Sequence, residues 1–154
     1  NYPSRSEERM ILERMVSTHL PKTQSVFSSR GILEMRERVD QIYMDDRIKE
    51  YILRLVMATR KNGEIRPEEA RSEKLKEVRQ AVYIGASPRA TLNLARAAKA
   101  HALLEQREYV IPDDIKAMAP EIFRHRLILT FDAEARGLST DDVILWLLET
   151  VVVP

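Results

Sequence analysis

The stretch from Pro88 to about Gln106 limits the fold more than any other part of the sequence. Alanine and leucine, which both have high helix propensity, supply about half of its residues. The small side chains also allow neighbouring backbones to approach closely. The sequence therefore predicts a long helix with other elements packed tightly against it. Its alanines and leucines include Ala95, Ala97, Ala98, Ala100, Ala102, Leu92, Leu94, Leu103 and Leu104.

Apolar residues at helical spacing predict further helices on both sides of this stretch. Ser4 and Glu7 form a capping-box pattern before the first of them, and Pro21 is expected to stop it. Arg60 and Lys61 are expected in the last turn of the third helix, where the helix dipole favours cations. The predicted helices run from Ser4 to Pro21, over 32–43, from Asp45 or Asp46 to Asn62-Gly63, from Pro67 to about Val82, from Pro112 to Pro120, and from Ser139 towards the end of the chain.

The fold class predicted is all-α, because no two strand-like patterns are joined by a hairpin turn. We expect a multi-helix bundle with at most one short extended segment near residues 126–131. The chain is divided into N-terminal helices at 1–63, a charged helical insertion at 64–84 and a helical bundle at 85–154. The insertion is expected to pack through one thin apolar line and to be exposed elsewhere. This line consists of Leu75, Val78 and Val82.

The charge balance argues against a protein whose main task is to coat nucleic acid. Lysine and arginine number 25 and aspartate and glutamate 24, so the formal net charge is only +1. The absence of cysteine excludes disulfides, thiolate metal sites and cysteine nucleophiles, and it fits a reducing compartment. No apolar run approaches the length of a membrane span, and the N-terminus has no signal-peptide pattern. We therefore expect a soluble cytoplasmic protein, and a chain that starts at Asn1 is expected to be a fragment of a longer one.

No motif for unaided catalysis or metal binding is present. The sequence lacks a phosphate loop, a dinucleotide-binding glycine pattern and a zinc-protease motif. His19 and His101 are expected to lie on helix faces, because neither has a second metal ligand at helical spacing. Arg124-His125-Arg126 is a small basic cluster that could meet a phosphate or an acidic neighbour. The paired aspartates all stand at predicted helix starts, where capping accounts for them, at positions 45–46, 113–114 and 141–142.

The start of the long helix places an arginine in an unusual position. Ser87 is expected to cap the helix through its hydroxyl, and Pro88 fits the first helical position, where an N–H has no partner. Arg89 then projects back beyond the helix start, where the dipole and free N–H groups favour an anion. A cation there is unfavourable without a negative partner, so the local chemistry suits a polyphosphate. On these residues alone, a solvated arginine in an ordinary helix start is the preferred interpretation.

The wider pattern resembles the C-terminal lid of MoxR-type AAA+ ATPases. The resemblance is densest from residue 85 onward and looser but continuous over residues 1–60. Ile111 stands where that family tends to have a capping threonine, which weakens the cap. The motifs that carry the resemblance are Gly85-Ala86-Ser87-Pro88-Arg89-Ala90, Tyr109 to Lys116, Arg124 to Leu127, Tyr2-Pro3-Ser4-Arg5 with Glu7-Glu8, Gly137-Leu138, Asp141-Asp142-Val143 and Val153-Pro154.

The resemblance implies a role for the helix start. Arg89 would be the sensor-2 arginine, reaching the γ-phosphate of ATP, with Ser87 and Pro88 forming the nucleotide-facing helix start. ATP and Mg²⁺ would be bound by a core domain upstream of Asn1, so this region alone would bind no cofactor and hydrolyse nothing. The family also implies a ring, usually a hexamer, that remodels or activates client proteins. Its partners would be its own core, neighbouring ring subunits and von Willebrand-A-domain proteins, with no nucleic acid and no membrane span.

Two other classes of function remain open from the sequence. The first is a free-standing helical protein-interaction or adaptor domain that docks partners through the charged 64–82 helix. The second is a helix-turn-helix DNA reader that uses Arg89, Arg96 and Lys99 on one helix. The near-neutral charge counts against the DNA reader. A phosphate loop upstream of Asn1 would separate the ATPase lid from the adaptor.

Overall fold

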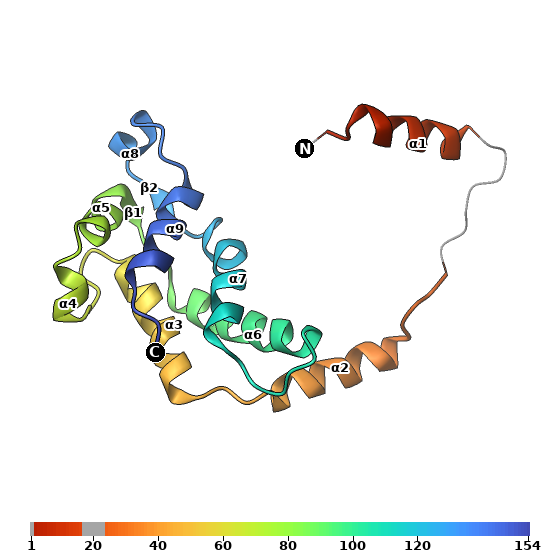
Figure 1. Cartoon of the computed structure of the whole chain (residues 1–154), viewed down its shortest axis with the longest axis horizontal. Helices are drawn as coiled ribbons and strands as arrows, with labels where there is room; N and C mark the ends of the chain where they lie inside the picture. The colour runs from red at the N-terminus through yellow and green to blue at the C-terminus, as the bar shows by residue number, and fades with distance from the viewer. Residues whose placement is uncertain (1, 17–23) are drawn as a thin grey trace. The chain divides into compact units, whose positions relative to one another are not determined.

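The computed structural model describes residues 2–16 and 24–154, and helices dominate these residues (Figure 1). The predicted all-α fold class is confirmed, with one small two-stranded sheet beside the helices. The predictions for Pro21 and His19 lie outside the described residues. The elements in chain order are α1 (Arg5–Met15), α2 (Ser29–Gln41), α3 (Asp46–Ala58), α4 (Pro67–Ala70), α5 (Glu73–Ala81), β1 (Val82–Ile84), α6 (Pro88–Leu104), α7 (Pro112–Phe123), β2 (Ile128–Leu129), α8 (Phe131–Ala135) and α9 (Thr140–Thr150).

Residues 1–34 form the smaller of two compact units, and 35–154 form the larger one. In the smaller unit, α1 begins with the predicted capping box. The backbone N–H of Ser4 donates to Glu7 Oε2 over 2.7 Å, and the N–H of Glu7 donates to Ser4 Oγ over 3.4 Å. These two bonds satisfy backbone groups that have no partner inside the helix. No residue of α1 is buried within the described part of the chain.

The core of the larger unit is built around α6, which packs against α7 and α3 (Figure 1). Helix α9 packs against α5, α7 and α3 and closes the other side of the core. The face of α6 that meets the core carries a residue every four positions, the spacing that keeps side chains on one side of a helix. All four residues of this face have no exposed surface, namely Ala90, Leu94, Ala98 and Ala102.

The segment predicted as one helix from Pro67 is two helices and a strand. Ser72 begins α5 as its N-cap, with its hydroxyl accepting the N–H of Leu75 over 3.4 Å, so the chain turns between α4 and α5. The helix stops at Ala81 because the next residues form β1, which pairs antiparallel with β2. The extended segment expected near residues 126–131 is β2. Its partner β1 was not predicted.

The predicted apolar line of this segment faces the core. Leu75, Val78 and Val82 are all buried, and α5 packs against α9. Glu69 and Ala81 are buried as well, so the segment contributes more to the core than the thin line alone. That residues 64–84 form an insertion relative to related chains stays a prediction.

Helix α3 begins where the sequence indicates and ends earlier. Asp45 is its N-cap and accepts the N–H of Arg47 over 2.9 Å. The helix ends at Ala58 rather than at Asn62-Gly63, so Arg60 and Lys61 lie beyond its last turn. The backbone tightens there, because the N–H groups of Thr59 and Arg60 donate to the carbonyls of Val56 and Met57, three residues back rather than four, over 3.2 and 3.0 Å.

A buried ion pair joins α3, α4 and the residues after α9. Arg54 Nη1 donates to Glu69 Oε1 over 2.9 Å, and both side chains are almost completely buried. Arg54 Nη2 donates to the carbonyl of Val152 over 2.9 Å, and the N–H of Val152 donates to the same Glu69 oxygen over 3.4 Å. Three segments far apart in the sequence therefore share one set of buried polar bonds.

Replacing Arg54 by alanine should destabilise the fold strongly, because Glu69 would remain buried without its cation. The expected loss in free energy of unfolding is roughly 3–5 kcal/mol. Urea unfolding followed by circular dichroism measures it. As a control, Lys76→Ala breaks an exposed pair with Glu73 and should cost less than about 0.5 kcal/mol. Equal losses from the two variants would contradict the role given to the buried pair.

Candidate functional site

The start of α6 presents the three residues singled out by the sequence. Ser87 is the N-cap with an extended backbone, Pro88 occupies the first helical position, and Arg89 occupies the second. All three residues are exposed. Among the described residues, Arg89 has no hydrogen-bond or ion-pair partner. An exposed guanidinium at this position is available to a ligand or to another domain.

One expectation for this helix start is wrong. The Ser87 hydroxyl was expected to accept a first-turn N–H, but the side chain forms no capping hydrogen bond. The reason is that the N–H of Ala90 already donates to the Ser87 backbone carbonyl over 2.8 Å. Ser87 is therefore the N-cap by its backbone conformation alone. Its hydroxyl accepts no hydrogen bond from the N–H groups of the first turn.

The charge around this helix start is positive. The first turn of α6 contains no acidic residue, whereas α7 and α9 each carry two aspartates there. Arg60 adds a second guanidinium close by, since its Nε donates to the carbonyl of Ala86 over 2.9 Å. Because the helix dipole is positive at the same end, an anion such as a phosphate group is the ligand that this arrangement favours.

The second basic cluster of the sequence is already paired within the fold. Arg124 donates to Asp141 over 2.8 Å and to Glu121 over 3.2 Å. Arg126 donates to the carbonyl of Ile122 over 2.8 Å. The acidic-neighbour interpretation of this cluster is therefore the one that fits. Within residues 2–16 and 24–154, no group of three or more His, Cys, Asp or Glu side chains is arranged to hold a metal ion.

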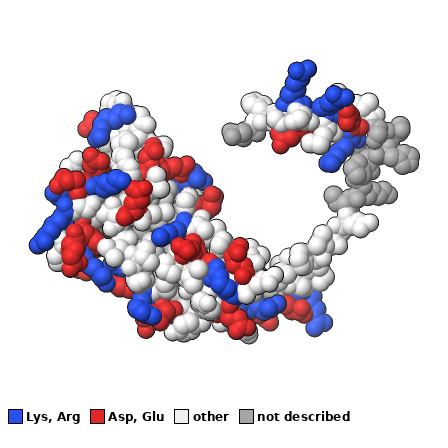
Figure 2. Space-filling view, in the orientation of Figure 1, with Lys and Arg blue, Asp and Glu red and all other residues white. Residues whose placement is uncertain are grey.

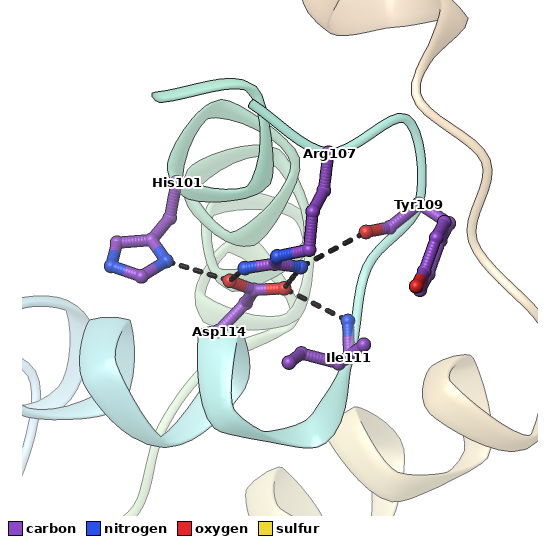
Figure 3. Close-up of polar contacts among 5 residues, drawn as sticks. All are labelled: His101, Arg107, Tyr109, Ile111 and Asp114. Carbon is purple, nitrogen blue, oxygen red and sulfur yellow. Dashed lines mark hydrogen bonds and ion pairs between the residues drawn. The ribbon is translucent and has the colours of Figure 1, made fainter. Parts of the chain in front are cut away.

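A carboxylate at the other end of α6 is buried and has partners that sequence reasoning missed (Figure 3). Asp114, in the first turn of α7, has no exposed side-chain surface. Its Oδ2 accepts from Arg107 Nη1 over 2.7 Å and from the N–H of Ile111 over 2.8 Å. Its Oδ1 lies 2.7 Å from His101 Nδ1 and also accepts from Arg107 Nη2. Asp114 thus joins the end of α6 to the start of α7.

The predicted capping role of Asp114 is correct but incomplete. Ile111 is the N-cap and its side chain offers no acceptor, so Asp114 alone reaches back to its N–H. The helix-face position expected for His101 is also correct, although the contact with Asp114 was not expected. Burial alone would raise the pKa of Asp114, but hydrogen bonds from Arg107, Ile111 and His101 outweigh it and lower the pKa from 3.8 to about 2. A buried carboxylate with this many partners is structural.

Two serines at helix starts should respond differently to alanine. Ser139 forms a full capping box with Asp142, whose N–H donates to Ser139 Oγ over 3.2 Å. Ser139→Ala should lower the free energy of unfolding by about 1 kcal/mol. Ser87→Ala should change it by less than about 0.5 kcal/mol, because its hydroxyl makes no such bond. Thermal melts of both variants provide the test, and a larger loss at Ser87 would show that the hydroxyl caps α6 after all.

The Asp114 carboxylate should make stability depend on acid. Its pKa in the fold, about 2, lies below the ordinary value of 3.8, so its contribution is present above the ordinary value and is lost as pH falls towards the folded one. The contribution is roughly 2 kcal/mol at neutral pH. The difference in free energy of unfolding between Asp114→Asn and the unchanged protein should therefore be largest at pH 7. This stability gap should shrink below about pH 4.

The neighbouring Asp113 is a matched control for this experiment, because its side chain is 81% exposed. Asp113→Asn should give a small stability difference that varies little with pH. Urea unfolding of both variants between pH 2 and pH 7 measures the two gaps. A gap for Asp114→Asn that stays constant over this range would contradict the assignment.

Comparisons with known proteins identify the region. The family described as "AAA lid domain" matches residues 74–145. The chain is 39% identical over 153 residues to "Chaperone MoxR1" of Mycobacterium tuberculosis, covering 99% of this chain and 38% of that protein. It is 32% identical over 154 residues to "Uncharacterized protein YeaC" of Bacillus subtilis, covering 99% of this chain and 43% of that protein.

One further match covers less of the chain, and a solved structure matches throughout. "Protein MoxR" of Methylorubrum extorquens is 42% identical over 71 residues, covering 46% of this chain and 21% of that protein. A crystal structure of a "putative ATPase" from Cytophaga hutchinsonii matches with a TM-score of 0.87 and 33% identity, covering 100% of this chain and 44% of that one. The chain thus spans about two fifths of the length of the relatives that it matches throughout. It carries the lid region of a MoxR-family AAA+ ATPase.

Proposed function

We propose that this region is the lid over ATP bound by a core domain of the same protein, and that Arg89 contacts the γ-phosphate as its sensor-2 arginine. The observation that carries the proposal is the start of α6. There an exposed, unpaired arginine stands at the second helical position of a helix whose first turn lacks any acidic residue. Ser87 and Pro88 form the rest of this nucleotide-facing start.

The chemistry of the guanidinium fits the γ-phosphate. Side chains in a helix lean towards its N-terminus, so Arg89 projects beyond the helix start. Its planar set of donors matches the oxygens of a phosphate better than a lysine ammonium does. A cation held there neutralises charge on the transferring phosphoryl group, and the lid closes when ATP is present and opens after hydrolysis. Mg²⁺ would be held with ATP by the core rather than by these residues.

The whole protein would act as an ATP-driven ring. AAA+ ATPases assemble into oligomeric rings, and the proposal places this lid against its own core and against neighbouring subunits of a hexamer. Hydrolysis would then drive remodelling or activation of client proteins, including von Willebrand-A-domain partners, in the cytoplasm. Among residues 2–16 and 24–154, no helix is long and apolar enough to cross a bilayer.

The two alternative functions have less support. The burial of Leu75, Val78 and Val82 leaves the adaptor only the charged face of the 64–82 segment for docking. On that face Lys74 is already paired with Glu149 and Lys76 with Glu73. The DNA reader needs Lys99 free, yet its Nζ donates to the carbonyl of Asp40 over 2.9 Å. Figure 2 shows Lys and Arg interspersed with Asp and Glu on the visible face of the larger unit, rather than a continuous basic surface. The lid is therefore the function that fits best.

Arg89→Ala in the full-length protein should lower the ATPase rate by at least about tenfold, because the variant loses the donor that neutralises the γ-phosphate. ADP affinity should change much less, since ADP has no γ-phosphate. Arg89→Lys should restore little activity, because a single ammonium cannot replace the planar set of donors. Steady-state hydrolysis and ADP titration calorimetry measure these effects.

Arg96→Ala is the matched control, since Arg96 is an exposed arginine on the same helix but lies two turns from its start. It should leave the hydrolysis rate within about twofold of the unchanged protein. Equal losses from Arg89→Ala and Arg96→Ala, or no loss from either, would mean that Arg89 is an ordinary surface residue.

A further inference from the structure

Ala86, the residue directly before the N-cap of α6, is bound by a side chain at the end of α3. Thr59 is 1% exposed, and its hydroxyl accepts the N–H of Ala86 over 3.0 Å while donating to the carbonyl of Val56 over 2.7 Å. The hydroxyl thus donates its proton into α3 and accepts one hydrogen bond from Ala86. It bridges two segments that are 27 residues apart in sequence.

The residue after Thr59 holds the other polar group of Ala86. Arg60 Nε donates to the carbonyl of Ala86 over 2.9 Å. Both backbone groups of Ala86, which is 1% exposed, are thus bonded to consecutive residues at the end of α3. Unlike a helix or strand ladder, this attachment depends on side chains, so single substitutions can remove it.

Gly85 allows the two segments to come this close. A Cβ atom at Gly85 would lie 2.5 Å from the backbone oxygen of Thr59, which is closer than real Cβ atoms approach. The obstacle is backbone rather than the end of a flexible side chain, so a larger residue would push the two segments apart. The sequence thus combines a glycine on one segment with a threonine and an arginine on the other.

The attachment fixes where α6 begins. Ala86 is followed directly by the N-cap Ser87, and Arg89 comes two residues later. On the far side of Arg89, Ala90 is completely buried in the core. The short exposed stretch from Ser87 to Arg89 is therefore held at both ends, by the α3 attachment before it and by core packing after it.

We propose that Thr59 is a positioning residue for Arg89, with Arg60 and Gly85 completing the attachment. Thr59 would not touch the nucleotide. By holding Ala86 in place, it would fix the position and direction of the Arg89 side chain so that the guanidinium reaches the γ-phosphate. The inference rests on the proposed role of Arg89 and adds the residues that hold it in place. A displacement of about 1 Å in a group of this kind can cost up to a hundredfold in rate.

The test is a double-mutant cycle on ATP hydrolysis by the full-length protein. Thr59→Val keeps the size of the side chain but removes the hydroxyl, and it should lower kcat by about tenfold. Thr59→Ser keeps the hydroxyl and should restore most of the rate. In the Arg89→Ala background, Thr59→Val should have less than about a twofold further effect, because the residue through which it acts is already gone.

Thr130→Val is the matched control. The Thr130 hydroxyl also accepts a backbone N–H, that of Ala133 over 3.3 Å, but it lies at the start of α8 and has no bond to residues 85–89. The control should lower the melting temperature less than Thr59→Val does, because the Thr130 hydroxyl is less buried, and it should leave kcat within about twofold. Gly85→Ala is a second variant at the attachment, and its loss of rate should likewise disappear in the Arg89→Ala background.

The outcomes separate the two proposals. If Arg89→Ala has no effect, the sensor-2 role fails and the positioning role fails with it. If Arg89→Ala slows hydrolysis but Thr59→Val slows it equally in both backgrounds, Thr59 supports the fold without positioning Arg89. If Thr59→Val does not fold, the same comparison made with Gly85→Ala decides, and equal losses in both backgrounds overturn the positioning role.

Discussion

The buried face of α6 is the constraint on which the larger unit depends. Three of its four fully buried residues are alanines, and the fourth is Leu94. Because these side chains are small, α7 and α3 can approach the α6 backbone closely, and dispersion contacts hold them there. A helix packed this tightly along one side has a fixed rotation about its axis. The opposite side is then free to present Arg89 and Arg96 to solvent.

Hydrogen bonds at the two ends of α6 also prevent the helix from sliding along its axis. At the start, Thr59 and Arg60 hold Ala86, and at the end, Asp114 binds Arg107 and His101. Apolar packing alone would allow the helix to slide by small amounts, whereas each hydrogen bond has a narrow range of distance and angle. A lid built in this way would move over a nucleotide as one body and would carry the arginine at its edge to a defined place.

The parts of the fold that could be predicted are those set by neighbouring residues. The caps at Ser4 and Ser139 and the proline at the start of α6 were predicted correctly, and the cap of α3 was narrowed to Asp45 or Asp46, because each depends on a few consecutive positions. Pairings between distant segments were not read. Nothing in the sequence around Arg54 indicates that its partner is Glu69, and β1 has too few residues to show a strand pattern.

The candidate site shows the same division. The position of Arg89 followed from the local pattern, but the hydroxyl bond expected of Ser87 was wrong, because the backbone carbonyl of the same residue took the N–H instead. The attachment of Gly85 and Ala86 to α3 joins residues more than twenty positions apart, so it needed the structure. Arg124 belongs to a basic cluster in the sequence, but in the fold its charge is paired with the carboxylates of Asp141 and Glu121.

The most direct test of the account is a structure of the full-length protein with a non-hydrolysable ATP analogue and Mg²⁺. The measured quantity is the distance from the Arg89 guanidinium nitrogens to the γ-phosphate oxygens. The account predicts at least one nitrogen within hydrogen-bond reach, about 2.7–3.2 Å. A closed lid in which Arg89 points into solvent while another residue of the lid contacts the γ-phosphate would contradict it.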